Sequence, residues 1–198
     1  MRLSLLNTIC LVAASLSAPA WANNDTALYA EAAPADASFV RFLGYGNEDS
    51  VQFDGKTFEL SADTETTYIA VSAAHLAETA PGSYVTVARR KDGSEVIVHE
   101  ASRDDAARVY LFLVNASDMA LDLRLADGST PIIQNVEQAQ SGVRAVNPVA
   151  VSLGVFAHGH DQAIATFDLS LRRGQNVSFV ADDTGVRLIE NRFGPVLR

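Results

Sequence analysis

The stretch VFAHGHDQ, residues 155–162, brings together two of the chain's four histidines and an aspartate. Imidazole nitrogens and carboxylate oxygens are ligands that zinc prefers, and a zinc site needs three or four ligands that converge. His158 and His160 supply two ligands and Asp161 a possible third, while His75 and His99 lie in the first half of the chain. Three alternatives stay open: a metal site, a loop that contacts a partner, and a polar turn between two strands. The pattern favours the turn, and we predict neither a metal nor a cofactor.

Motifs of hydrolases and acyl transferases are missing from the sequence. Their nucleophilic serine sits in a G-x-S-x-G turn, or is paired with a D-x-x-H base, because the base must reach the hydroxyl. The chain has no G-x-S-x-G, and the positions three before its histidines are Ser72, Val96, Val155 and Ala157. The acidic pairs, Asp104-Asp105 and Asp182-Asp183, are more typical of turns than of a glycosidase dyad. We therefore predict no catalytic residues and a protein that is not an enzyme.

The first 22 residues have the features of a secretory signal peptide. A short basic start precedes the largely apolar residues 3–16, and Ala20-Trp21-Ala22 has small residues where signal peptidase requires them. We predict cleavage between Ala22 and Asn23, export to the periplasm, and no transmembrane segment in the mature chain. Cleavage would also remove Cys10, the only cysteine, so an apolar core rather than a disulfide must stabilise the fold.

The chain is acidic, with 24 Asp and Glu against 15 Lys and Arg and a net charge of −9. Residues 23–117 carry 15 acids and 7 bases, whereas residues 118–198 carry 9 acids and 7 bases. Such a surface repels polyanions, which argues against nucleic acid as a partner. We expect the acidic first half, through residues such as Glu48, Asp49, Asp104 and Asp105, to steer toward a basic partner protein.

Short apolar runs separated by turn residues indicate an all-β fold. The runs cover residues 38–43, 56–60, 68–71, 83–88, 95–99 and 109–114, and then 121–125, 131–135, 149–156, 163–171, 176–181 and 186–191. Residues 72–78 could form one helical turn. We predict two small antiparallel β-sandwich domains, residues 23–117 and 118–198, joined by a short, fairly rigid connection near Asn115–Met119. VYLFLV, residues 109–114, would then be the last core strand of the first domain.

One function that this fold class could serve is that of a polysaccharide-binding β-sandwich module of the cell envelope. Such modules stack sugars on exposed aromatic rings, yet the only tryptophan lies in the predicted signal peptide. All five tyrosines lie in the more acidic half: Tyr29, Tyr45, Tyr68, Tyr84 and Tyr110. Arg144, Arg172 and Arg173 could form a modest cationic patch, although such arginines are more often solvated charges at strand ends.

Ordered landmarks along the chain resemble the AlgF family of periplasmic proteins required for alginate O-acetylation. Near the mature N-terminus they are Ala27-Leu28-Tyr29, Ala33-Pro34 and Ser38-Phe39-Val40-Arg41. Further on they are LRLADGST at 123–130, RAVNPV at 144–149, LRRG at 171–174 and SFV at 178–180. The resemblance covers nearly the whole mature chain, and no single motif in it is diagnostic.

The resemblance implies two linked β-sandwich domains without catalytic residues. It also implies partners, namely periplasmic SGNH-type acetyltransferases and a membrane-bound O-acetyltransferase that brings acetyl groups across the inner membrane. In that account the protein is an adaptor for the acetylation of a secreted, alginate-like exopolysaccharide, and the polysaccharide itself is a further possible partner. The binding module, and a small metal-dependent enzyme resting on His158 and His160, stay as alternatives.

Overall fold

A computed structural model describes residues 32–46, 48–103, 105 and 107–197. The predicted cleavage site between Ala22 and Asn23 lies outside these residues, as do Tyr29 and Asp104. Within the described part of the chain, no helix is long and apolar enough to cross a membrane.

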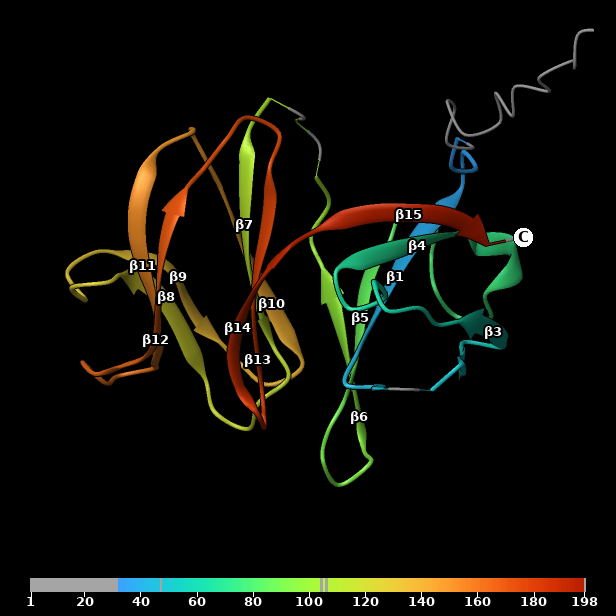
Figure 1. The fold of residues 1–198 in the computed structure, drawn as a ribbon, viewed down its shortest axis with the longest axis horizontal. Helices are drawn as coiled ribbons and strands as arrows, with labels where there is room; N and C mark the ends of the chain where they lie inside the picture. The colour runs from blue at the N-terminus through green and yellow to red at the C-terminus, as the bar shows by residue number, and fades with distance from the viewer. Residues whose placement is uncertain (1–31, 47, 104, 106, 198) are drawn as a thin grey trace, which may run out of the picture. The chain divides into compact units, whose positions relative to one another are not determined.

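The described residues form fifteen strands and one 3₁₀ turn, which confirms the all-β prediction (Figure 1). The strands of the first half are β1 (Ala37–Leu43), β2 (Ser50–Phe53), β3 (Lys56–Glu59), β4 (Thr67–Ser72), β5 (Tyr84–Arg89), β6 (Glu95–Glu100) and β7 (Val109–Asn115). Those of the second half are β8 (Leu121–Leu125), β9 (Pro131–Val136), β10 (Gln140–Val146), β11 (Ala150–Ala157), β12 (Ala163–Ser170), β13 (Asn176–Asp182), β14 (Gly185–Glu190) and β15 (Arg192–Leu197). The possible helical turn at 72–78 is the 3₁₀ turn Ala73–His75.

The first sheet has the strand order β15-β4-β1-β5-β6, and the small sheet β2-β3 accompanies it. Side chains alternate between the two faces of a strand, so each strand of the sheet can serve two layers. One face of β1 and β5 packs with β2 and β3 around Val40, Phe42, Val51, Phe58 and Val85. This apolar cluster forms the core of the first sandwich.

The second sandwich consists of two four-stranded sheets, β10-β7-β13-β14 and β12-β11-β8-β9. Its core takes alternate residues from both sheets, among them Leu111 and Leu113 of β7, Phe179 of β13, Leu123 of β8 and Val155 of β11. The separate sheets give the sandwich-like arrangement that the sequence predicted. The antiparallel prediction holds for most strand pairs, whereas β1–β5, β7–β13 and β4–β15 are parallel.

The two sheets at the centre of the fold also pack against each other. A third apolar cluster joins Leu43, Ala88 and Val98 of the first sheet to Phe112 and Val180 of the sheet that contains β7 and β13. Strand β7 therefore contributes to two cores, because Leu111 and Leu113 point to one side and Phe112 to the other.

Sheet membership does not follow the predicted limit between residues 117 and 118. The interpretation of Val109–Val114 as the last core strand of the first domain is wrong, because β7 lies between β10 and β13 in a sheet of the second sandwich. In the opposite direction, β15 pairs with β4 of the first sheet. The chain thus passes from the first sandwich to the second between β6 and β7 and returns at Asn191, while Ala116–Ala120 connects two strands of one sandwich.

Candidate partner-binding groove

VFAHGHDQ forms the end of β11 and the turn that leads into β12. Gly159 has a φ of 78°, a left-handed conformation that glycine adopts without steric cost. The turn is held on β8, because the His158 N–H donates to the Ala120 carbonyl at 2.8 Å and Arg124 donates to the His160 carbonyl at 3.1 Å. The sequence thus predicted the turn, and the His158 side chain, which is about half exposed, also contacts a neighbouring carboxylate.

His158 Nδ1 lies 3.0 Å from Oδ1 of Asp122, whose side chain is fully buried. The same carboxylate accepts hydrogen bonds from the Asn135 N–H at 2.7 Å and from Arg124 Nη2 at 2.6 Å. Burial by itself would raise the pKa of Asp122, but the hydrogen bonds from Asn135, His158 and Arg124 outweigh it, and the pKa of this carboxyl is lowered. The imidazole is therefore one of three groups that hydrogen-bond a buried carboxylate.

The remaining histidines do not join this turn. His75 and His99 are exposed and lie on the first sheet's side of the fold, in the 3₁₀ turn and in β6. Within the described ranges, no group of three or more His, Cys, Asp or Glu residues could hold a metal ion.

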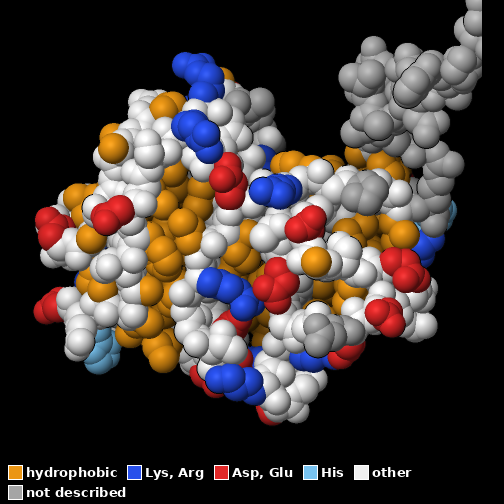
Figure 2. All heavy atoms as spheres, viewed as in Figure 1, with side chains coloured by type: hydrophobic (Ala, Val, Ile, Leu, Met, Phe, Trp, Pro, Cys, Tyr) orange, Lys and Arg blue, Asp and Glu red, His pale blue; other side chains and the backbone are white. Residues whose placement is uncertain are grey.

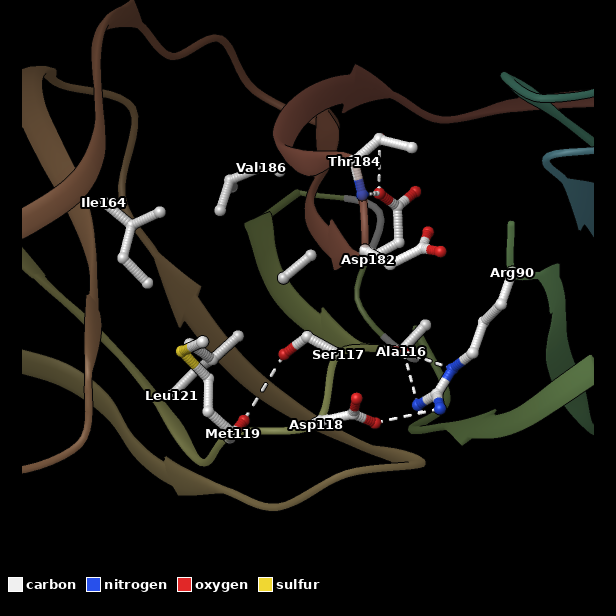
Figure 3. A pocket seen from close by; sticks show the side chains of 13 residues that line it. Arg90, Ala116, Ser117, Asp118, Met119, Leu121, Ile164, Asp182, Thr184 and Val186 are labelled. Atoms are coloured by element: carbon white, nitrogen blue, oxygen red, sulfur yellow. Dashed lines mark hydrogen bonds and ion pairs between the residues drawn. The ribbon is translucent and has the colours of Figure 1, made fainter. Parts of the chain in front are cut away.

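The open side of the second sandwich carries an apolar groove between the edge strands β12 and β14. Its wall is formed by Met119, Leu121, Ile164 and Val186, and it encloses a cavity of about 410 Å³ (Figure 3). Met119 is 50% exposed and Ile164 is 47% exposed. Figure 2 shows hydrophobic atoms in a continuous band over this side of the sandwich. We call these four side chains and the cavity between them the β12–β14 groove.

Charged groups at the rim of the groove are held by the protein itself. Arg90, from the turn after β5, donates to the Ala116 carbonyl at 2.9 Å and pairs with Asp118 at 2.9 Å (Figure 3). The Asp183 carboxylate accepts from the Lys91 N–H at 2.7 Å. The charged residues that line the groove are Arg90, Asp118, Asp182 and Asp183, and its remaining surface is largely apolar.

Other residues singled out in the sequence are dispersed. Asp105 is exposed and accepts from the Ala107 N–H at 2.8 Å, as expected of a turn, and Asp182 accepts from the Thr184 N–H at 2.8 Å. Arg144, Arg172 and Arg173 are exposed. Tyr45 and Tyr68 are buried core residues. None of these positions forms part of the apolar wall, whose members the sequence analysis did not identify.

Comparison with known proteins gives a consistent result over most of the chain. The family model described as "Alginate O-acetyl transferase AlgF" matches residues 11–178. The alginate biosynthesis protein AlgF of Pseudomonas fluorescens is 30% identical over 86% of this chain and 84% of its own length. Proteins with the same name from Pseudomonas syringae pv. tomato and Pseudomonas aeruginosa are 29% and 25% identical, over 84% and 90% of this chain.

Among solved structures, the C-terminal domain of AlgF from P. aeruginosa is similar to part of the chain. The similarity covers 42% of this chain and 96% of that domain, with 25% sequence identity and a TM-score of 0.37.

Fold and surface together define an all-β protein of packed sheets, with an apolar groove at the open side of its second sandwich. The family match extends over most of the sequence. The chain belongs to the AlgF family, whose members are named as alginate biosynthesis proteins.

Proposed function

We propose that this protein is a non-catalytic periplasmic adaptor for the O-acetylation of a secreted, alginate-like exopolysaccharide. It acts with periplasmic SGNH-type acetyltransferases and a membrane-bound O-acetyltransferase. In this proposal the partner enzymes carry out acetyl transfer, and the adaptor holds them in the positions that modification of the polymer requires. The signal peptide predicted over residues 1–22 supports a periplasmic location.

The β12–β14 groove is the observation that supports the adaptor role most strongly. Apolar surface that is rimmed by polar residues is a common feature of protein–protein contact sites. Here the apolar wall lies between β12 and β14, which are edge strands of their sheets in the described part of the chain, and an edge strand can pair with a strand of another protein. We assign this groove to an apolar segment of a partner acetyltransferase.

The hydrogen bond and the ion pair of Arg90 at the rim of the groove fit the same role. Arg90 belongs to a turn of the first sheet, yet it holds Ala116 and Asp118 beside the groove. A binding surface that is fixed before the partner arrives loses less conformational entropy on association. The contact between the sandwiches thereby supports the shape of the groove.

The function is tested in the bacterium that encodes this protein, by deleting its gene and measuring both the yield and the acetyl content of the secreted polysaccharide. The adaptor role predicts normal yield with acetyl groups lost. Both the wild-type protein and the double variant His158→Ala, His160→Ala should restore them. Unchanged acetylation in the deletion strain would contradict the proposal, and restoration by wild type alone would favour a role for the histidines.

A further inference from the structure

A buried ionic cluster lies where the first sheet packs on the sheet that contains β7 and β13. The side chains of Arg41 and Glu100 are both fully buried, with Nη2 and Oε1 3.5 Å apart, and Arg103, which is 4% exposed, places Nη2 3.1 Å from Oε2 of the same glutamate. Two guanidinium groups therefore share one carboxylate. Among the described residues, the cluster therefore has one positive charge in excess. A buried charge is costly unless it is paired, so this excess would be stabilised by a further negative group.

Neutral groups complete the cluster without removing that excess. The Tyr68 hydroxyl donates to Glu100 at 2.7 Å, and burial raises the pKa of this phenol, so it stays neutral. Arg41 donates to Asn191 Oδ1 at 2.6 Å and to Thr86 Oγ1 at 2.9 Å. The donors and acceptors of Arg41 and Glu100 are thus satisfied, and the unmatched capacity lies on Arg103.

The Arg103 guanidinium is stacked among aromatic rings. Its central carbon lies 4.0 Å from the centroid of Tyr84 and 4.2 Å from that of Phe112. Rings of this kind stabilise a cation through their negative faces but carry no charge that could neutralise it. Arg103 Nε has no hydrogen-bond partner among the described residues.

A cavity of about 320 Å³ opens beside Arg103. Arg108 and Asn176 line it, and Arg108 Nε, a donor, also has no hydrogen-bond partner within the described part of the chain. Asp105 is the acidic residue among the lining residues, and its carboxylate is engaged by the Ala107 N–H. The cavity thus combines two arginines with unmatched hydrogen-bonding capacity in an otherwise acidic protein.

Shape and chemistry of this cavity suit a carboxylate with a short apolar part. A guanidinium presents parallel N–H donors that match the two oxygens of a carboxylate. Tyr84, Tyr110 and the half-exposed ring of Phe193 form the remaining walls, against which a methyl or methylene group can pack. We propose that this cavity, the Arg103–Arg108 pocket, binds a carboxylate group. The group is either a free small acid such as acetate or the side chain of an acidic residue on a polypeptide.

The proposal does not depend on the adaptor role, and its test uses the purified mature chain without any partner. Isotope-labelled protein is titrated with sodium acetate, with N-acetyl-aspartate amide as a peptide-borne carboxylate, and with acetamide as a neutral analogue. We expect the NMR signals of Arg108, Tyr110 and Asn176 to change in chemical shift, in a saturable way, with at least one of the acids. Binding of acetate identifies a free acid as a sufficient ligand, and binding of the aspartate derivative alone identifies an acidic side chain.

Two variants separate recognition from folding. Arg108→Gln, at a partly buried position, should weaken the binding at least tenfold, whereas Lys56→Gln removes a positive charge from β3 and should leave it unchanged. Thermal unfolding of both variants checks that they fold. The proposal is overturned if neither acid binds, if acetamide binds as well as the acids, or if folded Arg108→Gln protein binds as tightly as wild type.

Discussion

The two faces of the sheet β10-β7-β13-β14 are packed in different ways. Toward the strands β8 and β11, the face is apolar and contributes residues such as Leu113 and Phe179 to the core of the second sandwich. Toward the first sheet, Phe112 and Val180 lie in an apolar cluster, while Ser178 hydrogen-bonds Asn191, which accepts from Arg41. The same sheet therefore has one apolar interface and one interface that is partly ionic.

The difference indicates a division of roles. Apolar burial is non-directional and stabilises many relative positions of two sheets, whereas a hydrogen-bonded ionic cluster is satisfied in only one. We infer that the apolar face supplies most of the stability of the second sandwich and that the cluster around Arg41 and Glu100 fixes how the first sheet pairs with it.

Glu100→Gln should have the largest effect, because it leaves Arg41 and Arg103 without their shared carboxylate. Removing one partner of a buried ion pair costs about 3–5 kcal/mol of the free energy of unfolding. Urea denaturation measures the loss. Glu190→Gln is the matched control, since Glu190 is exposed and its pairing distance to Arg172 is 3.9 Å, and it should change stability by less than about 0.5 kcal/mol. Equal effects of the two variants would refute the special status of the cluster.

Leu113→Ala probes the apolar face of the same sheet. It should cost about 2–4 kcal/mol, because the substitution removes buried methyl groups and leaves a cavity that the neighbouring strands fill only partly. The same denaturation experiment measures it, and the variant should retain carboxylate binding in the Arg103–Arg108 pocket. A loss of that binding in folded Leu113→Ala protein would show that the two faces are not independent.

Asp122→Asn tests the anchor of the turn that carries the histidines. The backbone N–H of Asn135 and the side chains of Arg124 and His158 would lose a charged acceptor, at a cost of about 1–3 kcal/mol near neutral pH. The pKa of Asp122 is lowered in the folded protein, so its contribution is present above the unfolded value near 3.9 and is lost as pH falls through the folded value. Stability measured against pH should therefore converge for wild type and variant at low pH, and a constant gap would contradict this.

His158→Ala should have the smallest effect, because the imidazole is half exposed and makes one of three ties to Asp122. We expect a loss of about 0.5–1.5 kcal/mol and no effect on polymer acetylation. Thermal unfolding and acetyl analysis of complemented strains measure the two quantities. A folded variant that fails to support acetylation would show that the turn has a functional contact.

Most strands could be predicted because alternation and turn residues mark them, and the exceptions have physical causes. β10 is an edge strand in which no residue is fully buried, and QSGVRAV shows no clear apolar face. β15 contains Gly194 and Pro195, which usually end a strand, but it joins the sheet at its edge, where proline is tolerated. β2 is only four residues long.

The sites were harder to predict than the strands. Arg41 and Glu100 are 59 positions apart in the sequence. A charged residue in a strand is normally expected to face solvent, and only the packing of the two sheets buries this pair. VYLFLV was correctly assigned to a strand, yet its apolar run indicates burial on both faces rather than the end of a domain. Met119 and Ile164 of the groove are isolated apolar residues in the sequence, and only the pairing of β11 with β8 and β12 brings their segments together.

The most direct test of the adaptor account is acetyl analysis of polysaccharide from deletion strains that express either Ile164→Asp or Val149→Asp protein at wild-type abundance. Both positions are about half exposed, but Ile164 lines the β12–β14 groove, whereas Val149 lies before the opposite end of β11. The account predicts that Ile164→Asp protein leaves the polymer unacetylated at normal yield and that Val149→Asp protein restores acetylation. Full acetylation with Ile164→Asp protein would contradict it.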